Sequence, residues 1–121
     1  MSFKFLNRNP YGDKIGDCVI RAISTALGID YYEVAYMLRQ NGKFYECEEL
    51  CVDCYEKLLS HDFQLPCFRG CGRTAKEIAN DFPNDTLILR MVGHLSTSIN
   101  GVLVDTWDCS DKIVTQFWIV E

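Results

Sequence analysis

The chain has 121 residues, of which 48% are hydrophobic and 24% charged, and it carries a net charge of −5 at neutral pH. This composition is typical of a globular protein, and the length predicts one domain over residues 1–121 with one core. Only 12 Lys and Arg residues oppose 17 acidic ones, which disfavours binding to nucleic acid. The apolar runs are too short to span a bilayer and the first residues lack a secretory signal. We therefore expect no membrane association and a cytoplasmic location.

Three helices are predicted in the first half of the chain. Apolar spacing predicts a first helix over Cys18–Leu27 that stops at Gly28, so that Cys18 lies in its first turn. A second helix starts at Asp30, which opens a sequence of capping-box form, and ends at Asn41-Gly42. The third spans about Glu46–Ser60.

The second half of the chain predicts one more helix and then strands. Thr74-Ala75-Lys76-Glu77 has the form of a capping box, and the short helix that it opens stops before Pro83. β-Branched and apolar residues then dominate four segments: Thr86–Val92, Leu95–Ile99, Val102–Thr106 and Ile113–Val120. Helices followed by strands predict an α+β fold in which the helices pack on a small C-terminal antiparallel sheet.

Seven cysteines are many for this length, and an odd number cannot all pair within one chain. Without an export signal, free thiols are favoured over a disulfide framework. Five of them form a central block: Cys47, Cys51, Cys54, Cys67 and Cys71. The first three share one helical stripe with Leu50 and Leu58, which favours core packing over a zinc site, the alternative that the spacing leaves open. We expect no metal ion.

The strongest hairpin signal is Asn100-Gly101. With these two residues as the turn, Ser96 faces Asp105, and His94 becomes a diagonal neighbour of Asp105 with backbones about 7–8 Å apart. An imidazole and a carboxylate can bridge that gap, whereas Asp108 points to the other face. The small Ser96 and Ser98 leave room on the face of His94 for the helix that begins at Cys18.

Cys18, His94 and Asp105 together have the side-chain types of a thiol nucleophile site. A helix N-terminus and a neighbouring imidazolium both lower the pKa of a cysteine by stabilising its thiolate. A carboxylate behind the imidazole fixes the tautomer and orientation of the ring. Of the nearby residues, Asp17 is expected to cap the helix and Arg21 to be a surface or capping charge.

Three segments resemble the papain-like cysteine proteases, particularly the compact members encoded by bacteriophages and prophages. They are Gly16–Ala22, Gly72-Arg73-Thr74, and Gly93-His94 with the later stretch Gly101–Asp108. The resemblance implies a helix-borne nucleophile packed against a small antiparallel sheet. It makes Cys18 the nucleophile, His94 the general base and acid, and Asp105 the orienting residue. It also implies a protein or peptide substrate, no cofactor and, for a phage-encoded protein, a location in the host cytoplasm.

The oxyanion hole of this family uses a side-chain amide, usually a glutamine a few residues before the cysteine. No glutamine precedes Cys18 here. Asn9 is the candidate, because Gly12 and Gly16 allow the loop to fold back, and Asn7 is second. The expected function is hydrolysis of a peptide or isopeptide bond. The alternative is a catalytically silent papain-like scaffold that binds a host protein.

Overall fold

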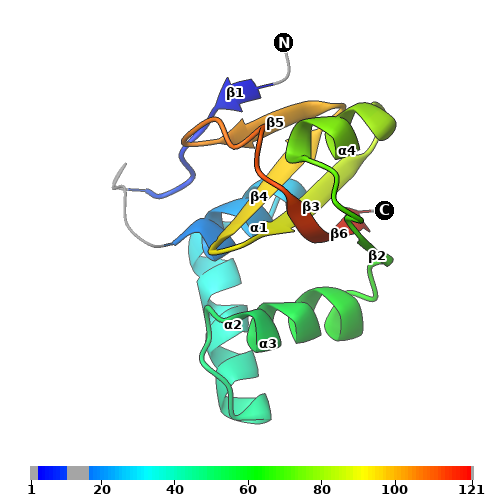
Figure 1. The fold of residues 1–121 in the computed structure, drawn as a ribbon. Helices are drawn as coiled ribbons and strands as arrows, with labels where there is room; N and C mark the ends of the chain where they lie inside the picture. Colours follow the sequence, from blue (N-terminus) through cyan, green and yellow to red (C-terminus); the bar gives the residue numbers. More distant parts are fainter. Residues whose placement is uncertain (1–2, 11–16, 121) are drawn as a thin grey trace.

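The computed structural model describes residues 3–10 and 17–120, and their strands form one mixed sheet in the order β1-β5-β4-β3-β6-β2 (Figure 1). The strands are β1 (Phe3–Phe5), β2 (Cys67–Arg69), β3 (Thr86–Met91), β4 (His94–Ile99), β5 (Val102–Asp105) and β6 (Val114–Val120). All neighbouring pairs run antiparallel except β1, which pairs in parallel with β5. The predicted α+β class is confirmed. The prediction of a purely antiparallel sheet is wrong at the edge formed by β1.

Helices cover both faces of the sheet (Figure 1). They are α1 (Cys18–Leu27), α2 (Tyr31–Tyr45), α3 (Val52–Glu56), which continues into a π-helical turn η1 (Lys57–Asp62), and α4 (Ala75–Asp81). Buried residues of α1, α2, α3 and η1 pack against Ile88 of β3, whereas α4 packs against Leu87 and Leu89. This alternation is the period of two of a strand that is buried on both faces. No helix in the described ranges is long and apolar enough to cross a membrane.

The ends of α1 and α4 follow the local signals in the sequence. Gly28 takes a left-handed conformation, with φ 67°, and its N–H donates to the carbonyl of Ser24, which ends α1 where predicted. Thr74 and Glu77 form the predicted reciprocal capping box at the start of α4. These bounds are confirmed because each depends on residues that are close in sequence.

The hairpin of β4 and β5 has the predicted register. Asn100 and Gly101 both have positive φ, as a two-residue turn requires, and Ile99 lies opposite Val102. The pairing continues to Thr97 and Val104, so Ser96 and Asp105 are the next residues in register.

The face against which α1 packs differs from the prediction. Ser96 and Ser98 lie opposite Leu89 and Leu87 of β3, whose side chains belong to the core on the α4 side. Leu95, on the other face, packs with α1. The two serines therefore do not make room for α1. Strand parity determines which residues share a face, but not which helix covers that face.

Gly42 lies inside α2 and does not end it, because the helix continues to Tyr45. A Cβ atom at this position would lie 2.9 Å from the carbonyl oxygen of Cys47. The glycine therefore allows the chain that leaves α2 to return against the helix. The predicted end at Asn41-Gly42 is wrong because the glycine serves a close backbone approach and not a cap.

The predicted third helix over Glu46–Ser60 is replaced by a turn and the shorter α3 and η1. Cys47 and Cys54 form a disulfide, with Cα atoms 5.9 Å apart. On one continuous helix these residues would be about 10.5 Å apart along the axis, too far for a disulfide. The prediction of one helical stripe is wrong here, as is that of free thiols for this pair. Cys54 nevertheless lies in the core, while Cys67 and Cys71 are exposed.

Candidate active site

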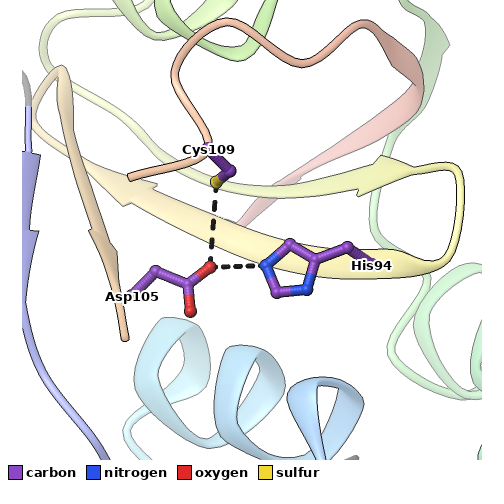
Figure 2. A group of neighbouring side chains, drawn as sticks. All are labelled: His94, Asp105 and Cys109. Carbon is purple, nitrogen blue, oxygen red and sulfur yellow. Dashed lines mark hydrogen bonds and ion pairs between the residues drawn. The ribbon is translucent and has the colours of Figure 1, made fainter. Parts of the chain in front are cut away.

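His94 begins β4 and Asp105 ends β5, and their side chains meet (Figure 2). The Nε2 atom of His94 lies 2.7 Å from Oδ2 of Asp105, and the two side chains are 10% and 3% exposed. The contact predicted from hairpin parity is confirmed. Asp108 instead accepts hydrogen bonds from the N–H and hydroxyl of Ser110, so its carboxylate serves the following turn.

Cys18 is the first residue of α1 and lines one cleft together with His94. The second ring nitrogen of His94 points toward α1 in Figure 2. Burial raises the pKa of the Cys18 thiol, but hydrogen bonds with the His94 side chain and the Leu95 backbone lower it, and so do the positive charges of His94 and Arg21. The net pKa of Cys18 is below its ordinary value, which favours the thiolate.

The imidazole of His94 is held in its charged form. Burial lowers the pKa of His94, but hydrogen bonds with Asp105, Cys109 and Cys18 outweigh it and raise the pKa to about 11. The ring of Trp107 packs on the imidazole, with centroids 4.8 Å apart, and is 41% exposed. It forms a wall beside the His94–Asp105 pair. The pKa shifts of Cys18 and His94 thus both favour the charged forms, a thiolate and an imidazolium.

The Asp105 carboxylate is saturated with donors. Ser96 Oγ lies 2.6 Å from its Oδ2 atom, and the Thr106 N–H lies 2.6 Å from Oδ1. Burial raises the pKa of Asp105, but the hydrogen bonds from His94 and Ser96 and the charge of His94 bring it below its ordinary value. Asp105 is therefore ionised beside the imidazolium.

Arg21 and Asp17 extend this network beyond the three predicted residues. Asp17 precedes α1 but makes no capping bond with its side chain, which accepts hydrogen bonds from Arg21 Nε at 2.7 Å and Tyr31 Oη at 2.7 Å. The other end of the guanidinium, Nη1, lies 3.2 Å from Asp105 Oδ1. The predictions of a capping Asp17 and a surface Arg21 are wrong. The i,i+4 spacing of an acid and an arginine was the sequence signal for their ion pair.

Asn9, the predicted oxyanion-hole residue, is buried beside this network. Its side-chain Nδ2 donates to Asp17 Oδ2 at 2.9 Å and to Tyr31 Oη at 3.4 Å. Its backbone N–H donates to the side-chain oxygen of Asn7. Gly12 and Gly16, which were expected to fold the loop back, lie outside the described residues. The oxyanion role of Asn9 stays a prediction.

His94 lines two clefts. One, of about 500 Å³, is lined by both Cys18 and His94, with Leu50 and Tyr55 among its apolar walls. The other, of about 560 Å³, is lined by His94 and Trp107 but not by Cys18. A ligand that extends through both clefts would pass the thiol and the imidazole.

Within the described ranges, one group of side chains could hold a metal ion: His94, Asp105 and Cys109, whose ligand atoms lie within 4.8 Å of one another (Figure 2). The Arg21 guanidinium on the same carboxylate opposes a second cation there. The disulfide of Cys47 with Cys54 also removes two thiols from the alternative zinc set. That no metal is needed stays a prediction.

The chain matches no protein-family model, no curated protein and no solved structure. The papain-like resemblance therefore rests on the sequence segments quoted above.

Proposed function

We propose that this protein is a papain-like cysteine peptidase, a thiol hydrolase that cleaves a peptide or isopeptide bond in protein or peptide substrates in the cytoplasm. Cys18 is its nucleophile, His94 its general acid and base, and Asp105 the residue that orients His94. One arrangement carries the proposal: the His94 imidazole, 10% exposed, lies 2.7 Å from Asp105 and lines one cleft together with Cys18, whose pKa it lowers.

The reaction follows from the charges of this pair. The Cys18 thiolate attacks the carbonyl carbon of the substrate and forms a carbon–sulfur bond. As the carbon–nitrogen bond breaks, the His94 imidazolium gives its proton to the leaving amine. Water then attacks the thioester while the neutral His94 takes a proton from it. Collapse of this second adduct releases the acid and restores the thiolate and imidazolium.

The clefts fit an extended substrate that crosses this pair. The cleft that contains Cys18 would receive the acyl half of the substrate, because the attacked carbonyl must lie beside the sulfur. The cleft beyond His94, walled by Trp107, would receive the leaving amine, because His94 protonates that half. Asp105 acts only through the ring that it holds.

Reaction with iodoacetamide near neutral pH, followed by peptide mapping, tests the nucleophile. We expect Cys18 to be alkylated faster than the other free cysteines, because its pKa is lowered below the ordinary value. Cys51 is the matched comparison, since it is another free cysteine that lines the same cleft. Faster reaction at Cys51, Cys67 or Cys71 in the folded protein would refute the assignment of Cys18.

Cleavage of a peptide library tests the activity itself. Cys18→Ser should abolish cleavage and leave the fold intact, because a hydroxyl ionises far less readily than a thiol. A Cys18→Ser protein that keeps its full biological effect and its partner binding would support the alternative, a silent scaffold that binds a host protein.

A further inference from the structure

Arg21 joins the two buried carboxylates near the proposed site. Its Nε atom contacts Asp17 at 2.7 Å and its Nη1 atom contacts Asp105 at 3.2 Å, and its side chain is only 11% exposed. Nη1 also donates to Thr106 Oγ1 at 3.1 Å. A guanidinium can serve two acceptors at once because its donors are fixed in one plane.

Asp17 holds Arg21 through Nε, whereas Asp105 contacts Nη1. Its carboxylate is 4% exposed and also accepts hydrogen bonds from Tyr31 of α2 and from Asn9. Burial raises the pKa of Asp17, but these hydrogen bonds and Arg21 keep it below its ordinary value. Through Asp17, Arg21 is therefore tied to Tyr31 of α2 and to Asn9 in the segment that follows β1.

The two oxygens of Asp105 have different partners. Oδ2 accepts hydrogen bonds from His94 and Ser96, whereas Oδ1 accepts them from Arg21 and the Thr106 N–H. A carboxylate that is held at both oxygens cannot rotate about its terminal bond without losing contacts. The donors on Oδ1 thus determine the direction in which Oδ2 meets the imidazole.

We propose that Arg21 is a positioning residue of this site: anchored by Asp17, its guanidinium fixes the Asp105 carboxylate in the orientation that holds His94 against Cys18. This inference rests on the proposed function, and it adds to the three expected residues a fourth, together with its anchor. The charged groups around Asp105 are Arg21 from α1 and His94 from β4, with the thiol of Cys109 from the chain after β5.

The rate of Cys18 alkylation by iodoacetamide, measured against pH, tests the role of Arg21 without a known substrate. In Arg21→Met we expect the acid limb of the rate profile to move to higher pH, because His94 is no longer held against the thiolate and a nearby positive charge is lost. A shift of about one pH unit would lower the rate on that limb roughly tenfold. Arg39→Met is the matched control, since Arg39, on α2, forms an exposed ion pair with Glu49, and this variant should keep the wild-type profile.

The double variant Arg21→Met with Asp17→Asn separates positioning from charge balance. It removes one positive and one negative charge, so it avoids the unpaired Asp17 carboxylate that could unfold the single variant. We expect the melting temperature of the double variant to be close to that of the wild type. The acid limb of its alkylation profile should still lie at higher pH than that of the wild type. A wild-type limb in the double variant, or in a folded Arg21→Met protein, would overturn the inference.

These measurements separate the inference from the proposed function. If the alkylation rate of wild-type Cys18 falls on the acid side at the same pH as that of an ordinary thiol, the proposed function fails. If the wild type has this limb and the variants share it, only the role of Arg21 fails.

Discussion

The Asp105 carboxylate differs from that of Asp108, three residues later, in its burial and in its charged partners. Asp105 is buried between His94 and Arg21, whereas Asp108 binds Ser110 in a turn. The difference comes from strand parity and from the end of β5, because Asp108 lies beyond the strand. Substitution of each residue by the same amide therefore separates the effect of a buried charge from that of an exposed one.

We expect Asp105→Asn to lower the alkylation rate of Cys18 at neutral pH about tenfold, since a loss of about one pKa unit of ion-pair stabilisation has that effect. An asparagine still orients the ring but stabilises the imidazolium less. Asp105→Ala should also lower the free energy of unfolding by about 3–5 kcal/mol, because it leaves two buried cations without their shared partner. Alkylation rates and thermal melting measure both effects. Asp108→Asn is the control, and a larger loss there would contradict the role of Asp105.

At the scale of elements, the disulfide between Cys47 and Cys54 shapes the connection from α2 to α3. Leu50 and Cys51, which lie between the two cysteines, line the cleft that contains Cys18. The covalent link therefore holds one wall of the candidate site. In a reducing cytoplasm such a link would be opened, so its state depends on the compartment.

Reduction of this disulfide should lower the free energy of unfolding by about 2–3 kcal/mol, because a link across so short a loop removes little entropy from the unfolded chain. Melting curves with and without reductant measure the change. Cys47→Ser should show the lower stability in both conditions, whereas Cys51→Ser should respond to reductant like the wild type. Peptide mapping of the oxidised protein that finds no link between Cys47 and Cys54 would contradict the expectation.

For the whole molecule, the buried ion pairs determine how stability depends on pH. The folded pKa values of Asp17 and Asp105 lie below their ordinary value of 3.8. Their contribution to stability is therefore complete above about pH 4 and is lost as the pH falls through the folded values. Acid unfolding should begin with this network, since protonation of either carboxylate removes one of the two charged partners of Arg21.

Below pH 9, the titrations of His94 and Cys18 should have opposite effects on the stability of the wild-type protein. The pKa of His94 is raised from 6.5 to about 11, so its contribution is complete below pH 6.5 and is lost as the pH rises toward 11. The pKa of Cys18 is lowered from 9.0, so its contribution grows as the pH rises through the folded value. Between the folded pKa of Cys18 and 9.0, the folded chain thus holds more protons at His94 and fewer at Cys18 than the unfolded chain does.

We therefore expect the stability of the wild type to fall less steeply than that of Cys18→Ser as the pH rises toward 9. The slope for the variant should approach about 1.4 kcal/mol per pH unit, the value for one proton. Urea unfolding at several pH values measures it. Parallel curves for the two proteins would show that Cys18 and His94 do not form an ion pair.

The sequence by itself determined the parts of this protein that depend on neighbouring residues. Gly28 ended α1, Thr74 and Glu77 capped α4, and Asn100-Gly101 set the hairpin register. That register was enough to bring His94 to Asp105 and to exclude Asp108. In each case one backbone conformation or one hydrogen bond between near neighbours decides the outcome, and the residue types report it directly.

Only the tertiary structure decided which distant segments meet. Nothing in Phe3–Phe5 signals a parallel partner in β5, and no spacing rule predicts that Cys47 bonds to Cys54 across a turn. Arg21 pairs with Asp17, four residues earlier, and this spacing indicates the ion pair. It also pairs with Asp105, and no sequence spacing indicates that contact. Contacts between distant residues depend on how helices and strands pack, and packing leaves no periodic pattern in the sequence of either partner.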